Sequence, residues 1–219
     1  MRLKWVCAGG CNATCGLYDL VGPNQGGGTC VYGWFFNGLL GLTQEMHVDL
    51  LRKKARVFPA LPSADSVTSL RVWHCKYGSL EPIRAFAGLQ KLVIATYPDN
   101  SFENLSQLLA LEELEIIHFP RVTTLEPLAR LPRLRVLKLA SLPSWDSSSK
   151  RLKVDSLEPL AHLPKLEVLH LLGVVPPSRS LAELEASTTL KAVRLLGYSA
   201  KERERFLQVT RVKQAPSEA

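Results

Sequence analysis

A six-beat apolar pattern, L-x-x-L-x-x-L-x-x-L-x-x-L-x-L, recurs along this chain of 219 residues at nearly constant spacing. Two copies are complete and run from Leu125 to Leu139 and from Leu157 to Leu171. Four more copies fit the same frame, and we call the six apolar positions of each copy its beats. The fifth beats are at positions 70, 92, 114, 137, 169 and 193, which are 22, 22, 23, 32 and 24 residues apart. Since one set of six apolar residues is too small to bury itself, this period predicts a stacked solenoid.

Each copy contains its own secondary-structure signals. The closing L-x-L alternates at period two and predicts a short strand, whereas the preceding triplets suit a tight helical turn. Pro82, Pro127 and Pro159 stand near the start of that turn, where a missing N–H does little harm. The copies therefore predict a curved parallel sheet with helical turns on its other side.

The phrases "LEPLARLPRLRVLKL" and "LEPLAHLPKLEVLHL" resemble the leucine-rich-repeat family, in particular the bacterial 22-residue type of internalin-like proteins. The resemblance implies an α/β solenoid, with the parallel sheet on its concave side and short helical turns on its convex side. The family places Asn or Cys three residues after the last strand leucine. Here that position is occupied by Cys75, Tyr97, Phe119, Leu142, Val174 and Tyr198. Because only the first of these matches, we expect apolar groups to pack the bends.

Both ends of the chain differ from the repeats. We expect an N-terminal cap over residues 1–57, six repeats over residues 58–198, and a C-terminal capping helix with a frayed tail over residues 199–219. In the cap, residues 31–42 supply apolar cover, and Thr43–Arg56 is interpreted as an amphipathic helix. The capping-box sequence Ser199–Glu202 predicts that the last helix begins there and runs to about Val209.

The cap contains four cysteines, Cys7, Cys11, Cys15 and Cys30. Their C-x3-C-x3-C-x14-C spacing fits structural zinc sites poorly, because those sites pair cysteines in two knuckles. Three states remain open for them: free buried thiols, which we favour, a zinc site, or disulfides. The glycine-rich run from Gly22 to Thr29 approaches a phosphate loop but has Gly28 where the lysine should stand. A metal- or nucleotide-binding cap is therefore the alternative function.

The five histidines are scattered along the chain, and none completes a set of nucleophile, base and orienting group. We predict that the protein is not an enzyme and needs no cofactor. No apolar run is long enough to span a bilayer, and the short apolar start is interrupted by glycine, so we expect a cytoplasmic protein without a membrane partner. The net charge is +7, but the sequence has no dense basic stripe with interleaved aromatic residues, which is typical of nucleic-acid-binding surfaces. Acidic polymer binding through residues 130–153 stays open as a third function.

If the last two beats face inward, their neighbours form columns on the concave sheet. The residue after each sixth beat gives an apolar column of Trp73, Ala95, Ile117, Ala140, Leu172 and Leu196. The residue between the beats gives Arg71, Val93, Glu115, Lys138, His170 and Arg194. An apolar row beside a charged row is typical of a protein-binding patch, although a loop or the cap could cover it.

We therefore predict a non-catalytic protein-binding module, and a bacterial immunity protein that neutralises a toxin is the specific hypothesis. Its partner would be another protein, such as a toxin or effector. An insertion around Trp145 in the 32-residue step either contacts the partner or folds back on the solenoid. The predicted partner-binding residues are Arg71, Trp73, His74, Glu113, Glu115, Ile117, His118, Lys138, Trp145, His170, Leu172, Arg194 and Leu196.

Overall fold

The computed structural model describes residues 31–34, 46–61, 63–141 and 151–216. Within them the strands are β1 (Val31–Trp34), β2 (Met46–Leu51), β3 (Val67–Trp73), β4 (Lys91–Ala95), β5 (Glu113–Ile117), β6 (Val136–Ala140), β7 (Leu152–Lys153), β8 (Val168–Leu172), β9 (Val174–Val175), β10 (Ala192–Leu196) and β11 (Lys213–Gln214). The helical elements are η1 (Ala64–Ser66), η2 (Glu81–Ala85), η3 (Phe102–Asn104), η4 (Glu126–Arg130), α2 (Glu158–Ala161), η5 (Ala182–Ala186) and α3 (Ala200–Thr210).

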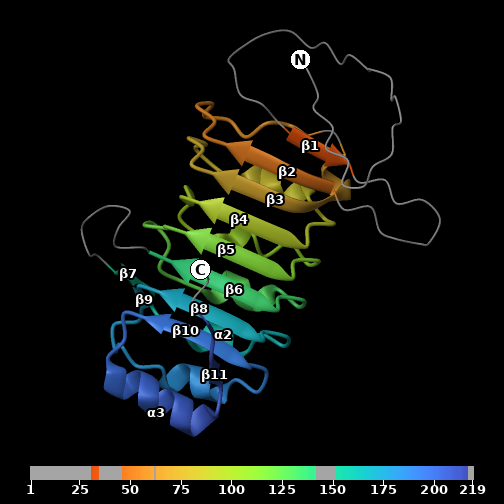
Figure 1. Ribbon diagram of the computed structural model, residues 1–219. Helices are drawn as coiled ribbons and strands as arrows, with labels where there is room; N and C mark the ends of the chain where they lie inside the picture. The colour runs from red at the N-terminus through yellow and green to blue at the C-terminus, as the bar shows by residue number, and fades with distance from the viewer. Residues whose placement is uncertain (1–30, 35–45, 62, 142–150, 217–219) are drawn as a thin grey trace, which may run out of the picture.

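Nine of the eleven described strands form one sheet in the order β1-β2-β3-β4-β5-β6-β8-β10-β11, and β7 and β9 pair in parallel as a separate two-stranded sheet. Only β1 is antiparallel to its neighbour, and every other pair in this sheet is parallel. The strands stack side by side along the molecule, and the short helical turns lie behind them (Figure 1). The molecule is therefore a leucine-rich-repeat solenoid.

Most of the core is formed by residues at the predicted beats. Every fifth and sixth beat, from Leu70 and Val72 through Val193 and Leu195, is at most 5% exposed. The strands align these residues in register, so that Leu92 pairs with its equivalents on both sides. Burial of two leucine-sized side chains per strand stabilises each coil by several kcal/mol, roughly 1.5–3 kcal/mol for each side chain. The fifth and sixth beats of all six predicted copies therefore lie in the core.

Apolar side chains pack the bends after the strands, as expected from the absence of Asn or Cys at most of these positions. Tyr97, Phe119, Val174 and Tyr198 are all buried at the bend position. The hydroxyl of Tyr198 donates to the carbonyl of Val174 at 2.9 Å, so its polar end is also satisfied. At the one matching position, the thiol of Cys75 donates to the carbonyl of Leu50 at 3.1 Å and accepts from the Lys53 amide at 3.4 Å.

The described part of the segment Thr43–Arg56, residues 46–56, is not a helix, which corrects our interpretation. It contains β2, which pairs in parallel with β3. Met46 and Leu50 are buried as expected, but Leu51 is 42% exposed. Alternation at period two places Val48 and Leu50 in the core. These two residues precede Leu70 and Val72 by 22 residues, so the repeat register begins one strand before the first predicted copy.

Carboxylates connect successive repeats on the helical side. The backbone N–H of Leu80 donates to Asp99 at 2.8 Å, that of Leu157 donates to Glu183, and that of Leu181 donates to Glu202 at 2.7 Å. Each N–H lies at the start of a helical turn, where no partner exists within the turn itself. The acceptor always comes from the following repeat or from α3, so these bonds join neighbouring coils.

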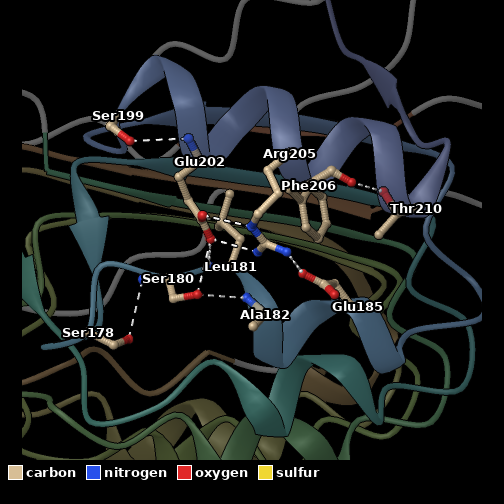
Figure 2. A network of polar contacts seen from close by, with 10 residues as sticks. All are labelled: Ser178, Ser180, Leu181, Ala182, Glu185, Ser199, Glu202, Arg205, Phe206 and Thr210. Carbon is tan, nitrogen blue, oxygen red and sulfur yellow. Dashed lines mark hydrogen bonds and ion pairs between the residues drawn. The ribbon is translucent and has the colours of Figure 1, made fainter.

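The helix α3 closes the C-terminal end and begins one residue after its predicted cap (Figure 2). The hydroxyl of Ser199 accepts from the Glu202 N–H at 3.1 Å, as predicted. The Glu202 carboxylate does not return to Ser199. It accepts instead from Leu181 and Ser180 of the last repeat and from the Arg205 guanidinium, whose nitrogens lie 2.9 and 2.8 Å away. Phe206 is fully buried beneath the helix.

The chain just beyond α3 forms a strand, where the sequence predicts a frayed tail after the capping helix. Lys213 and Gln214 form β11 and pair in parallel with Ala192 and Val193 of β10. The edge of β10 is therefore covered at its first two residues, whose backbone groups are paired. In the described part of the chain, no helix is long and apolar enough to cross a membrane.

Candidate functional site

The outward face of the sheet is set by strand alternation. In β3, for example, Leu70 and Val72 are buried, whereas Arg71 and Trp73 are partly exposed. The core beats of β4, β5, β6, β8 and β10 are buried in the same way, so the residues between and after the last two beats share one face, although His170 of β8 on that face is itself buried. We call this face of β2, β3, β4, β5, β6, β8 and β10 the trough.

One column of the trough carries charge. The register aligns it across seven strands as Asp49, Arg71, Val93, Glu115, Lys138, His170 and Arg194. The Arg71 guanidinium donates two hydrogen bonds to the Asp49 carboxylate, of 2.6 and 2.7 Å. Burial alone would raise the pKa of Asp49, but the hydrogen bonds and charge of Arg71 outweigh it and hold that pKa below its ordinary value, and His47 acts in the same direction. Asp49 is therefore a carboxylate at neutral pH.

His170 corrects the prediction for this column, because it is only 4% exposed. In the register it lies between Lys138 and Arg194. A partner that rests on the trough would therefore find little of the His170 imidazole exposed.

The second column is apolar and lies along the ends of the strands. The register aligns it as Leu51, Trp73, Ala95, Ile117, Ala140, Leu172 and Leu196. Leu51 and Leu196 at its two ends are 42% and 44% exposed, and Trp73, Ile117 and Leu172 are half-buried. The two alanines are buried. We call these seven residues the apolar row, and its large side chains are accessible as the sequence predicts.

A third column is polar toward the N-terminal end of the solenoid. His47 and Ser69 share a hydrogen bond of 2.8 Å, and Lys91 forms an ion pair with Glu113 at 2.7 Å. Glu113 contributes to a shallow hollow of about 40 Å³ in the middle of the trough. The hollow is lined by Lys91, Leu92, Val93, Glu113, Leu114, Glu115, Val136 and Lys138. Charges of both signs therefore surround a small apolar floor.

His74 and His118 were predicted to face a partner, but their backbone has another role. Both have a positive φ, 51° and 64°, at the position where the chain turns away from the sheet. Arg52, Thr96, Gly173 and Gly197 occupy the same position in other coils and also have positive φ. The backbone conformation at this position is therefore set by the turn. Because residues of several types occupy it, the sequence did not reveal the positive φ.

The trough includes β2, one strand before the first strand that the repeat pattern predicts. His47, Asp49 and Leu51 of β2 add one residue to each of the three columns. The signal was the apolar alternation of Met46, Val48 and Leu50 at the repeat spacing.

Other predicted features lie outside the described residues. These are Trp145, the four cysteines of the cap and the glycine-rich run from Gly22 to Thr29. The metal or nucleotide site in the cap therefore stays a prediction. Within the described ranges, no three histidine, cysteine, aspartate or glutamate residues are grouped so that they could hold a metal ion.

No protein-family model and no curated protein matches the chain. Among solved structures, it is similar to an internalin (inlF) from Listeria monocytogenes, with 15% identity and a TM-score of 0.43 over 70% of this chain and 48% of that chain. It is also similar to an internalin C2 (inlC2) from the same organism, with 15% identity and a TM-score of 0.43 over 77% of this chain and 80% of that chain. The chain thus spans about half the length of the first of these proteins. The leucine-rich-repeat fold itself follows from the strand register and the buried beats of this chain.

Proposed function

We propose that the protein is a non-catalytic binding module that holds another protein in its trough. The observation that carries this proposal is the apolar row, which stays accessible at Leu51 and Leu196 while a charged column runs beside it. Accessible apolar side chains in a row that is bordered by charge are typical of an interaction site. Trp73, Arg71 and Arg194 add the residue types that most often anchor interfaces.

The specific form of the proposal is a bacterial cytoplasmic immunity protein that neutralises a toxin by direct binding. A stack of strands fixed by buried leucines presents its side chains in a preformed arrangement, which reduces the entropy lost on binding.

The test compares two exposed leucines. Leu196→Asp places a charge in the apolar row, whereas Leu109→Asp places the same charge at a leucine that is 58% exposed and lies outside the sheet. A partner is first isolated with tagged wild-type protein from the source cells, and its affinity for each purified variant is then measured by calorimetry. We expect Leu196→Asp and Arg194→Glu to weaken binding at least about tenfold and Leu109→Asp to leave it unchanged.

Equal affinity of all variants for the partner would place binding elsewhere and would contradict the proposed trough. Circular dichroism of each variant checks that the fold is retained. The immunity role requires, in addition, that one equivalent of this protein abolishes the toxic activity of the purified partner. A partner that stays fully active in the saturated complex would refute that role while leaving protein binding intact.

A further inference from the structure

The turns that follow β2 and β3 lie together at one corner of the solenoid. The amide of Lys76 donates to the carbonyl of Lys53 at 2.9 Å, and the amide of Gly78 donates to the carbonyl of Arg56 at 2.8 Å. Five basic residues are thereby gathered on two adjacent turns. We call this set the basic corner, and it consists of Arg52, Lys53, Lys54, Arg56 and Lys76.

The positive charge of the basic corner is poorly compensated. Apart from Lys53, its members are exposed and form no ion pair with another described residue. The only acidic residue between positions 50 and 80 is Asp65. It precedes β3, so the length of that strand, roughly 23 Å for seven residues, separates it from the corner. Asp99, on the following turn, already accepts from the Leu80 amide.

The basic corner adjoins one end of the apolar row. Leu51 immediately precedes it in the chain and pairs in register with Trp73. The Trp73 ring meets the His74 ring edge-on, with centroids 5.4 Å apart. An accessible leucine and an indole therefore lie directly beside a cluster of cations.

The rest of the trough decides between an acidic protein segment and a nucleic acid. Asp49, Glu113 and Glu115 lie on the same face, where they would repel a phosphate backbone that continued along the strands. Trp73 is also the only Phe, Tyr or Trp of the described trough columns, so successive bases would find no row of such rings on which to stack. A polypeptide can place carboxylates at the corner and other side chains in the trough.

We propose that the basic corner receives an acidic segment of the partner protein. An aliphatic or aromatic side chain of that segment rests on Leu51 and Trp73, and its carboxylates face Lys54 and Arg56. This inference rests on the proposed function and specifies the chemistry of the partner at one end of the trough. Attraction between the corner and such a segment also accelerates association and depends on salt.

The experiment uses a displayed library of random 15-residue peptides, selected on the full-length wild-type protein. Selected peptides are synthesised with a fluorescent label, and their affinities are measured by anisotropy. The test variant is Lys54→Glu/Arg56→Glu. The control is Arg133→Glu/Lys165→Glu, which changes the net charge equally at exposed residues that precede β6 and β8. Labelled single-stranded RNA and duplex DNA of random sequence are measured in parallel.

We expect the selected peptides to combine Asp or Glu with an aromatic or aliphatic residue. Their affinity should fall at least about tenfold in the test variant and in about 500 mM salt, and stay unchanged in the control. Selection of neutral or basic peptides, no selection at all, or equal loss in both variants would overturn the inference. So would oligonucleotides that bind at the corner more tightly than any peptide. If partner binding fails in Leu196→Asp but survives in Lys54→Glu/Arg56→Glu, the proposed function stands and this inference falls.

Discussion

At the scale of single residues, the left-handed turn after each strand is the most demanding position. Gly173 occupies it with φ of +77°, and a Cβ added there would lie 2.6 Å from the backbone oxygen of Ser141. Other coils place His74, Thr96 or His118 at this position, which shows that the φ alone is tolerated. The close approach of the neighbouring coil is what makes glycine necessary at Gly173.

We therefore predict that Gly173→Ala lowers the free energy of unfolding by about 2–3 kcal/mol, because it adds left-handed strain of roughly 1–2 kcal/mol to a backbone clash. Urea unfolding followed by circular dichroism measures the effect. The matched control is Gly78→Ala, whose added Cβ meets its nearest atom at 3.6 Å. That control should stay within about 1 kcal/mol of the wild type. Equal effects of both substitutions would refute the role of the close approach.

At the scale of elements, α3 is held to the last repeat by Glu202. Hydrogen bonds from Arg205, together with those from Leu181 and Ser180, lower the pKa of this carboxyl to about 2 against the opposing effect of burial. The stability that it contributes is fully present above its unfolded pKa of 4.5 and is lost as the pH falls toward 2.

Glu202→Gln should accordingly destabilise the protein by about 1 kcal/mol at pH 7, since it weakens charge-assisted hydrogen bonds at a partly exposed site. The difference between wild type and variant should shrink as the pH is lowered from about 5 to about 2. Urea unfolding at a series of pH values measures it. Glu204→Gln removes an exposed carboxylate from the same helix and serves as control. A difference that stays constant over this pH range would contradict the assigned carboxylate role.

At the scale of the whole molecule, each coil contacts only its neighbours, so damage at one end should stay local. Phe206→Ala empties a fully buried position under α3, and we expect it to cost about 3–5 kcal/mol locally. Hydrogen exchange should show lost protection in η5, β10 and α3, with β3 and β4 unchanged. Val209→Ala, at a residue that is 58% exposed on the same helix, should leave exchange unchanged. Uniform loss of protection along the sheet would contradict this view.

The sequence predicted the architecture because the repeat is encoded in buried leucines, whose period leaves few alternative folds. It misassigned β2, since a short segment rich in leucine and lysine also fits a helix when its 22-residue offset from Leu70 and Val72 is overlooked. The trough columns followed from strand alternation alone. The burial of His170 and the contacts of Glu202 could not be predicted in this way. Both depend on how neighbouring coils pack against one another, which the spacing of residues in the sequence does not reveal.

The carboxylate links between coils have a consequence for how such a molecule can evolve. Asp99, Glu183 and Glu202 lie on the helical side and bind backbone N–H groups of the preceding repeat. The ion pairs in the trough, such as that of Lys91 and Glu113, are half-exposed and contribute little to cohesion. Substitutions in the trough can therefore accumulate without loosening the stack, so that one scaffold can be adapted to successive partners while its frame is inherited intact.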